Sequence, residues 1–416
     1  MTLRILWASD RIIGGSSAYT KVTYQMCTRL AKLDCKVAHV PMGKANRMGI
    51  WTYENVMICP SGDHPFAEDI LLDHYVDFKA DMLVLLKDIW VLAEIQNFAI
   101  NYVPYCPIDH SPVSILITSK MQTAFRVLVP SRFGEKELTN ANVQNVRYLP
   151  HGVSLDTYQP LEEHRAECKK LWFLPEDDFT VLIVARNQAR KMIPHMLRAF
   201  KLFKERNPDV KSHLFLWTDV APSSGETYEG ALSMGVGDSG VNLIPEILQL
   251  GLDKHALWPD RKLIRRGIPE NSGMNFKGGW DMNKLYNAAD VLLGTTGGEG
   301  FFLPGLEAQA CGKPIVVTDY AAAPEVCGVG LTVPASDYMI LNTPGTRYAV
   351  ANLDKTADAL TKIMNSDRNK LARRARAFAE RFSWENIIER YWKPFQEEAE
   401  NELKPLITKE GKKTWA

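Results

Sequence analysis

Residues 291–308 read VLLGTTGGEGFFLPGLEA and combine the three parts of a strand–loop–helix corner. The apolar start predicts a buried strand, the glycines that follow predict a loop, and the segment from Leu303 predicts a helix. Backbone N–H groups at the start of such a helix carry partial positive charge, which favours a bound phosphate. Glu299, before the helix, could hold sugar hydroxyls, and Glu307, about two turns into it, could hold a ribose. The alternative is a helix-terminal carboxylate at Glu299 and a solvated side chain at Glu307.

A second corner of this kind follows the apolar run at 179–185. Arg186 and Lys191 leave the carboxyl end of the predicted strand, the edge at which open α/β sheets bind ligands. Together the two cations could neutralise a diphosphate, because arginine supplies directional donors and lysine a point charge. A solvated connection between strand and helix is the alternative interpretation.

Apolar runs of strand length recur in both halves of the chain and alternate with helical or loop segments, which is typical of parallel sheets with crossover helices. They lie at 3–8, 36–40, 56–59, 81–86, 99–105 and 126–129, and again at 179–185, 212–217, 291–294 and 314–319. Proline and glycine punctuate the stretch around Pro150 and Gly152. We therefore expect an α/β protein of two doubly wound domains, divided after residue 152.

Composition excludes several other classes of protein. The chain has 416 residues, of which 46% are hydrophobic, and its 49 basic side chains balance 49 acidic ones. This neutrality disfavours a nucleic-acid binder, although the basic segment 369–376 is either a solvated helix face or a contact for anionic lipid or nucleic acid. The seven cysteines form no C-x-x-C pair, which suits thiols in a reducing cytosol, and no zinc site is legible. No signal peptide or membrane-spanning run is visible, so we expect a cytoplasmic protein, with peripheral membrane contact left open.

Several segments in the second half resemble the family-four retaining glycosyltransferases, of the glycosyltransferase group 1 type, whose signature is a glutamate, seven residues and a second glutamate. The matching segments are, in chain order, LPHGV at 149–153, Arg186 with Lys191, LYNAAD at 285–290, Glu299 with Glu307, GKPIV at 312–316 and FSWE at 382–385. The resemblance implies a GT-B fold, in which two Rossmann-like domains face a central cleft. Residues 1–152, completed by a helix at about 384–416, would form the acceptor-side domain, and 153–383 the nucleotide-sugar-binding domain.

The resemblance also implies roles for individual residues of the second half. Arg186 and Lys191 would bind the donor diphosphate, Glu299 the hydroxyls of the donor sugar and Glu307 the ribose. The donor site would be completed by Gly300, Phe301, Phe302 and Leu303, the last three through backbone N–H groups that face the distal phosphate.

Two segments of the first half match the family as well. Gly14 and Gly15 resemble its glycine loop, which faces the donor phosphates, and a tight turn is the alternative interpretation. His110 follows a predicted strand at the place where the family carries a polar residue beside sugar and acceptor, and Asp109 is a possible acceptor-side residue. A hydrogen-bonded loop histidine is the alternative for His110.

Phe302 departs from the family pattern, which has glycine after the signature phenylalanine. Glycine permits unusual backbone angles or a close approach of ligand. Phe302 therefore implies either an ordinary backbone conformation at this position or a reshaped sugar pocket. Backbone donors do not depend on the side chain, so the expectation of a nucleotide site is unaffected.

The implied reaction moves a hexose from a UDP- or GDP-linked donor to an unidentified acceptor hydroxyl with retention of configuration. In the front-face mechanism the leaving phosphate oxygen accepts the proton of the acceptor, so the protein mainly orients the reactants. No Asp-x-Asp triplet occurs, and two cations can replace a divalent ion, so we expect metal-independent transfer without a cofactor, releasing UDP or GDP. Three alternatives stay open: a GT-B nucleotide-sugar epimerase, a transferase acting on a modified nucleic-acid base, and a non-catalytic sugar-nucleotide binding protein.

Overall fold

The computed structural model describes residues 2–15, 17–43, 46, 49–221, 240–274, 276, 279–341 and 345–403. The chain forms two compact units. Unit 1 comprises Met1–Ile108, Val113–Gly152 and Trp384–Ala416, and unit 2 comprises Asp109–Pro112 and Val153–Ser383. The chain passes between units after Gly152 and after Ser383, where the sequence analysis placed its boundaries. The loop Asp109–Pro112, expected in the first domain, groups with unit 2.

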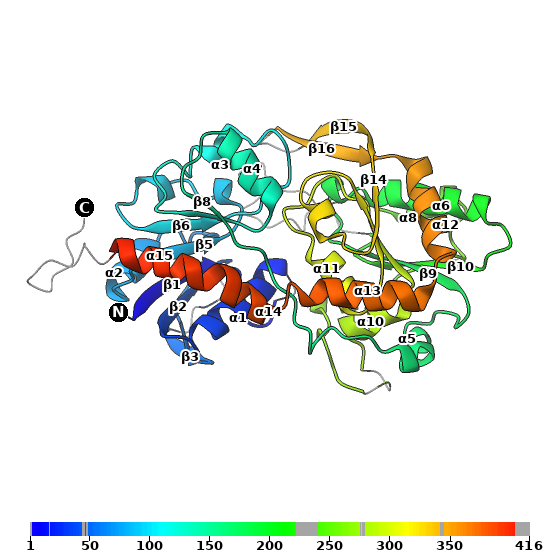
Figure 1. The fold of residues 1–416 in the computed structure, drawn as a ribbon, viewed down its shortest axis with the longest axis horizontal. Coiled ribbons are helices and arrows are strands. Elements are labelled where there is room, and N and C mark those ends of the chain that lie inside the picture. Colours follow the sequence, from blue (N-terminus) through cyan, green and yellow to red (C-terminus); the bar gives the residue numbers. More distant parts are fainter. Residues whose placement is uncertain are drawn as a thin grey trace, which may run out of the picture. The chain divides into compact units, whose positions relative to one another are not determined.

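Eight described strands form the sheet of unit 1, in the order β3-β4-β2-β1-β5-β6-β7-β8 (Figure 1). The strands are β1 (Leu3–Ser9), β2 (Cys35–Pro41), β3 (Trp51–Tyr53), β4 (Val56–Ile58), β5 (Met82–Leu86), β6 (Tyr102–Tyr105), β7 (Val127–Val129) and β8 (Val146–Tyr148). Neighbouring strands are parallel except for the antiparallel pair β3 and β4. The order reverses between β1 and β5, and open α/β sheets commonly bind ligands at the carboxyl ends of such strands.

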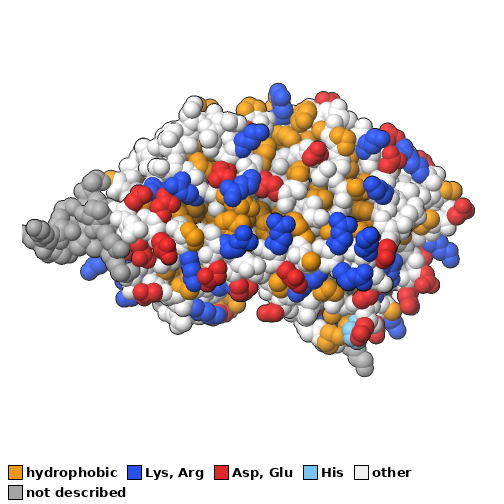
Figure 2. Space-filling view, viewed as in Figure 1, with side chains coloured by type: hydrophobic (Ala, Val, Ile, Leu, Met, Phe, Trp, Pro, Cys, Tyr) orange, Lys and Arg blue, Asp and Glu red, His pale blue; other side chains and the backbone are white. Residues whose placement is uncertain are grey.

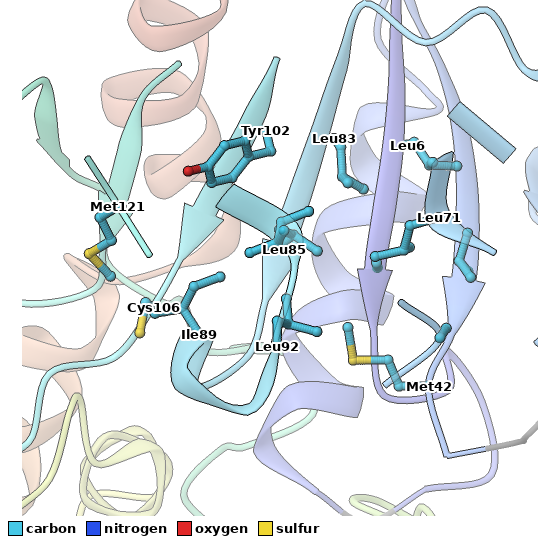
Figure 3. Packing of buried hydrophobic residues seen from close by; sticks show 14 of the residues in the cluster. Leu6, Met42, Leu71, Leu83, Leu85, Ile89, Leu92, Tyr102, Cys106 and Met121 are labelled. Atoms are coloured by element: carbon cyan, nitrogen blue, oxygen red, sulfur yellow. The ribbon is translucent and has the colours of Figure 1, made fainter. Parts of the chain in front are cut away.

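Helices and a continuous apolar core complete unit 1. The helical segments are α1 (Ala18–Leu30), α2 (Leu71–Asp77), η1 (Ile89–Val91), η2 (Ile95–Asn97), α3 (Ile115–Thr118), α4 (Arg132–Asn140), α14 (Trp384–Ile387), η6 (Ile388–Trp392) and α15 (Lys393–Leu403). Figure 3 shows part of the core, in which Leu6, Leu83 and Leu85 of the central strands pack with side chains from the flanking segments. Burying such apolar surface is the main favourable contribution to folding.

The C-terminal helices belong to unit 1, as the sequence analysis expected. Glu398 of α15 lies 3.1 Å from Nε of Arg126, which directly precedes β7, and 2.6 Å from NH2 of Arg147 in β8. Tyr391 packs edge-on against Tyr148 of β8, with ring centroids 5.3 Å apart. These contacts show that unit 1 is assembled from both ends of the sequence.

Unit 2 has a fully parallel sheet of six described strands, in the order β11-β10-β9-β12-β13-β14. The strands are β9 (Phe179–Val184), β10 (Ser212–Trp217), β11 (Ala256–Leu257), β12 (Val291–Gly294), β13 (Ile315–Thr318) and β14 (Gly330–Val333). The helical segments are η3 (Glu162–His164), α5 (Arg165–Leu171), η4 (Ala189–Lys191), α6 (Ile193–Arg206), α8 (Ile244–Gln249), α9 (Arg261–Arg266), α10 (Met282–Ala288), α11 (Leu303–Ala310), η5 (Ala323–Val326), α12 (Leu353–Met364) and α13 (Arg368–Glu380). The two doubly wound α/β units confirm the predicted fold class.

A two-stranded antiparallel sheet was not anticipated. Strands β15 (Ala335–Leu341) and β16 (Thr346–Ala351) form it between β14 and α12. Most of β15 is exposed, including Tyr338 and Ile340, so its apolar residues do not mark a core strand as they do elsewhere in the chain. The polar, glycine-rich segment 221–240, which by its position in the sequence is a candidate for shaping acceptor choice, lies almost wholly outside the described residues.

The basic segment 369–376 is part of α13, and its cations divide into two groups. Arg376 donates hydrogen bonds to the carbonyls of Tyr158 and Ala310, so it is a structural residue of unit 2. Arg373 and Arg374 are exposed. Figure 2 shows Lys and Arg side chains interspersed with acidic ones on the face that carries α13, which agrees with a solvated helix face. None of the described helices has the length and apolar character needed to span a membrane.

Candidate active site

Two strand–loop–helix corners of unit 2 meet at the carboxyl ends of β9 and β12. These strands are parallel neighbours, and the strand order reverses between them. The β9–α6 corner passes through the 3₁₀ turn η4, and the β12–α11 corner contains the glycine-rich loop. The two loops are joined directly, because the N–H of Gly297 donates to the carbonyl of Arg190 at 2.8 Å. A crevice at such a reversal is the expected ligand site of an open α/β sheet.

A buried ion pair lies at this junction. Lys191 Nζ is 2.6 Å from Glu299 Oε1, and the two side chains are 13% and 8% exposed. Burial, followed by the neighbouring charge of Arg190, lowers the pKa of Lys191. The helix-terminal alternative for Glu299 is wrong, because its carboxylate engages the other corner. An ammonium and a carboxylate held together with little water can each exchange partner for a phosphate or a hydroxyl.

Arg190 adds a second cation to the pair. Its NH1 atom lies 3.7 Å from Glu299 Oε2 and donates to the carbonyl of Gly298 at 3.1 Å. The same atom lies 3.7 Å from Asp109 Oδ2. Arg190 therefore touches both carboxylates of the site, a position that the sequence analysis did not assign to it.

The loop Asp109–Pro112 contributes an aspartate and a histidine. His110 is 2% exposed, and its Nδ1 lies 2.8 Å from Asp109 Oδ1. A carboxylate only accepts, so Nδ1 carries the proton of this bond. Burial acts to raise the pKa of Asp109, but the His110 hydrogen bond and the charge of Arg190 outweigh it and hold that pKa below its usual value. The hydrogen-bonded interpretation of His110 is thus confirmed.

Glu307 is buried in α11 and is 4% exposed, so its interpretation as a solvated helix residue is wrong. Because α11 begins at Leu303, Glu307 lies in the second turn of this helix. Its Oε2 accepts a hydrogen bond of 2.7 Å from the hydroxyl of Tyr286 in α10. Burial and the nearby Glu307 carboxylate raise the pKa of Tyr286 well above its usual value, so the phenol stays a donor.

Phe302 adopts a left-handed backbone with φ +72°, immediately before α11. The expectation of an ordinary backbone conformation here is wrong, since the position keeps an angle that favours glycine. Its ring lies in the interior against Gly294 and Gly305, where a Cβ on Gly305 would come 2.5 Å from Phe302 Cδ1. The two glycines therefore make room for the phenylalanine, and the ring is directed into the core of unit 2.

Gly297 and Gly298 are required by close packing. A Cβ on Gly297 would lie 3.0 Å from the Arg190 carbonyl oxygen, from Met192 Cε and from Tyr348 Cβ. A Cβ on Gly298 would collide with the carbonyl oxygen of Asp109. These glycines allow three separate backbone segments to converge beside Glu299.

Not every predicted site residue joins this cluster. The side chain of Arg186 is exposed and forms no ion pair or hydrogen bond with the described residues. Gly300, Phe301 and Leu303 are buried in the β12–α11 corner, with Leu303 as the first residue of α11. Gly14 and Gly15 lie in unit 1, where Gly14 has φ +72° and open space around it. Their expected role opposite the donor phosphates stays a prediction.

Sequence reasoning missed Arg190, Tyr286 and Tyr348. Tyr286 lies within the LYNAAD segment, and its position two residues into a family phrase could have marked it. Tyr348 lies on the unanticipated strand β16, so no pattern pointed to it. In the described part of the chain no three His, Cys, Asp or Glu side chains gather as a metal site would require.

Part of the chain matches a known family. Residues 253–364 match Glycosyl transferases group 1. This segment contains Glu299, Glu307 and Tyr348, and the match supports the predicted resemblance to that group of glycosyltransferases. The narrower assignment to family four stays a prediction.

Curated relatives carry one name repeatedly. The D-inositol 3-phosphate glycosyltransferase of Saccharomonospora viridis is 29% identical over 59% of this chain and 49% of its own length. The protein of that name from Actinosynnema mirum is 28% identical over 60% of this chain and 51% of its own length. The chain thus aligns with about half the length of these relatives.

Solved structures share the fold over nearly the whole chain. Sucrose-phosphate synthase from Thermosynechococcus elongatus superposes with a TM-score of 0.69 at 17% identity, covering 96% of this chain and 100% of that one. Anabaena Alr3699/HepE in complex with UDP-glucose gives a TM-score of 0.66 at 14% identity, covering 95% and 100%. These neighbours confirm the GT-B fold that the resemblance implied.

Proposed function

We propose that the protein is a retaining glycosyltransferase that moves a hexose from a UDP- or GDP-linked donor to an acceptor hydroxyl. The observation that carries the proposal is the buried Lys191–Glu299 pair, held at the strand-order reversal beside the start of α11. It offers a cation for the diphosphate and a carboxylate for sugar hydroxyls within a few ångströms of each other. The match to Glycosyl transferases group 1 across this region supports the same reaction class.

In the proposed mechanism Lys191 and Glu299 separate from each other when the donor binds. Lys191 and Arg190 turn to the diphosphate, and the backbone N–H groups of Phe302 and Leu303 add partial positive charge. Positive charge placed in advance around the leaving phosphate lowers the barrier to its departure. Arg186, on the same loop and exposed, is the further cation that the donor would recruit.

Glu299 and His110 orient the sugar in this proposal. Glu299 accepts hydrogen bonds from the donor hydroxyls once Lys191 has released it, and Asp109 orients the ring of His110 through the bond to Nδ1. The departing phosphate oxygen takes the proton of the attacking hydroxyl. Glu307, fixed by Tyr286, accepts from the ribose.

The acceptor is proposed to be a small polyhydroxylated molecule. Relatives matched over about half their length are named for D-inositol 3-phosphate, which makes inositol phosphates the first acceptors to test. No observation in the structure favours the epimerase, the nucleic-acid base transferase or the non-catalytic binding protein.

The deciding experiment is a donor panel. The purified protein is incubated with UDP-, GDP-, ADP- and TDP-hexoses, with EDTA or with Mg²⁺ and without acceptor, and released nucleoside diphosphate is measured. We expect slow hydrolysis of one UDP- or GDP-linked donor at equal rates in EDTA and Mg²⁺. If no donor released nucleoside diphosphate and no nucleotide raised the melting temperature, the proposal of an enzyme would be contradicted. Conversion of the sugar without nucleotide release would identify an epimerase.

Lys191→Ala tests the observation itself. Loss of one preorganised cation at a developing negative charge should lower donor turnover by about 10²–10³-fold. The matched control is Lys201→Ala on α6, a lysine that pairs with Glu205 at the surface. Turnover by Lys191→Ala at the level of Lys201→Ala would remove Lys191 from the mechanism.

A further inference from the structure

The β15–β16 hairpin is hydrogen-bonded to the glycine-rich loop of the site. The N–H of Ala349 in β16 donates to the carbonyl of Gly297 at 2.8 Å. Beside this bond the Tyr348 side chain lies over both glycines, since its Cδ1 would be 3.2 Å from a Cβ on Gly298. Tyr348 is 4% exposed, although its partner in register, Met339, lies on the exposed strand β15. Strand alternation therefore directs this one aromatic ring of the hairpin at the site.

The same ring contacts the histidine of the site. The rings of Tyr348 and His110 meet edge to face, with centroids 6.5 Å apart and planes at 66°. Tyr348 thus stands between the Gly297–Gly298 backbone and the imidazole. Because the Tyr348 ring contacts the glycine backbone on one side and the His110 ring on the other, it sets the distance between His110 and the β12–α11 corner.

A second tyrosine ties the hairpin to the loop that carries His110. The hydroxyl of Tyr320, two residues after β13, accepts from the N–H of Ser111 at 2.9 Å and donates to the carbonyl of Arg347 at 2.8 Å. One phenol oxygen therefore bridges the loop Asp109–Pro112 to strand β16. The loop is held on one side by this bridge and on the other by Arg190.

We propose that the β15–β16 hairpin positions His110 for the transfer reaction and that Tyr348 is the positioning residue. The inference rests on the proposed function and deepens it, because it assigns the distance between His110 and Glu299 to a strand outside both site corners. Reacting groups must be held within fractions of an ångström, and a displacement of about 1 Å can cost 10²-fold in rate. Because the Tyr348 ring contacts His110 directly, we expect the hairpin to act mainly on kcat and much less on nucleotide affinity.

The test compares Tyr348 with an exposed residue of the same hairpin. Tyr348→Ala removes the ring at the site, Tyr348→Phe retains the ring, and Ile340→Ala removes an exposed apolar side chain of β15 as the control. With the donor that the wild type hydrolyses, we expect kcat to fall roughly 10–100-fold in Tyr348→Ala and to stay within about threefold in the other two. The Kd for the released nucleoside diphosphate should change by less than about threefold in all three. Should Tyr348→Ala fail to fold, Tyr348→Leu retains apolar bulk and replaces it.

A double-mutant cycle shows whether Tyr348 acts through His110. If it does, Tyr348→Ala in a His110→Ala background lowers kcat no further, because the group it positions is already absent. Additive losses would overturn the inference, as would equal kcat in Tyr348→Ala and Ile340→Ala, or a loss of nucleotide affinity that matches the loss of kcat. An active wild type with these results refutes the inference alone, whereas a wild type silent with every donor refutes the proposed function and the inference with it.

Discussion

The β1–α1 corner of unit 1 (residues 10–17) and the β12–α11 corner of unit 2 (residues 295–302) lie on opposite sides of the strand-order reversals of their sheets. Each follows a strand beside the reversal of strand order. Each also holds a carboxylate–lysine pair of nearly equal length, with Lys87 Nζ 2.7 Å from Asp10 Oδ1 and Lys191 Nζ 2.6 Å from Glu299 Oε1.

The two corners are supported in different ways. In the β1–α1 corner, Ser17 donates to Asp10 and its Oγ accepts from the Thr20 N–H, so neighbours in sequence hold the loop. In the β12–α11 corner no side chain caps the helix, and the loop is held instead by the Phe302 ring in the core and by contacts from β16. One corner is built by local hydrogen bonds and the other by long-range packing.

Phe302 should be the largest single support of either corner. Phe302→Ala removes a buried ring and leaves a cavity between Gly294 and Gly305, so we expect a loss of about 3–5 kcal/mol in the free energy of unfolding. Gly14→Ala in the β1–α1 corner adds only the left-handed strain of alanine, about 1 kcal/mol, because nothing lies within 4 Å of the added Cβ. Urea unfolding of the two variants measures both values.

Phe302→Gly separates the ring from the backbone angle. Glycine leaves the same cavity but adopts φ +72° without strain, so it should cost about 1 kcal/mol less than alanine at this position. Equal losses for glycine and alanine would show that the left-handed angle carries no strain, and a small loss for both would mean that local bonds support this corner too.

Acid should destabilise unit 1 more than unit 2. Unit 1 fully buries two histidines in the neutral form, whereas His195 and His255 of unit 2, whose pKa values burial also lowers, are only partly buried. Burial lowers the pKa of His39 to about 4 and that of His151 to about 3. The unfolded chain takes up these protons near pH 6.5 while the folded unit does not, so stability falls as the pH drops below 6.5. The slope is about 1.4 kcal/mol per pH unit for each histidine. Calorimetry between pH 7.5 and 5 should show one transition moving to lower temperature ahead of the other.

His39→Asn is the control for this pH dependence, since it removes one titrating group and keeps an amide near Nδ1, which bonds the carbonyl of Trp7. The slope attributed to unit 1 should fall by about 1.4 kcal/mol per pH unit between pH 6.5 and 4. An unchanged slope would place the acid sensitivity elsewhere in the molecule.

The smallest expected effect is at the helix cap of the β1–α1 corner. Ser17→Ala removes the acceptor for the Thr20 N–H and should cost about 1 kcal/mol in stability. Ser17→Asp, which retains the cap but places a second carboxylate beside Asp10, is the comparison variant. A loss well above that of Gly14→Ala would show that the hydroxyl also supports the Asp10–Lys87 pair.

The contrast between the corners explains what the sequence could predict. Buried parallel strands read as continuous apolar runs, so β1, β5, β9 and β12 were placed within a residue or two of their observed bounds. Lys191 and Glu299 were identifiable because charged residues directly after buried strands must lie at the carboxyl edge of the sheet.

The rest of the site depends on backbone geometry that local patterns do not encode. Arg186 and Arg190 occupy the same loop, and only the η4 turn, which ends at the left-handed Met192, directs Arg190 rather than Arg186 to Glu299. Phe302 gave the opposite difficulty, because its ring is accommodated by two glycines, one in β12 and one in α11. Tyr348 could not be predicted from the sequence, because its strand β16 belongs to a hairpin whose other strand, β15, is exposed.

The contact of α15 with β7 and β8 has a consequence for the order in which the protein is made. A ribosome completes the whole of unit 2 before it releases the residues that carry Glu398, so the first unit to begin synthesis is the last to be finished. Until then Arg126 and Arg147 lack Glu398 as their partner, and the face that receives α15 is open. A nascent chain that stops before residue 384 would therefore hold a complete candidate site next to an unfinished neighbour.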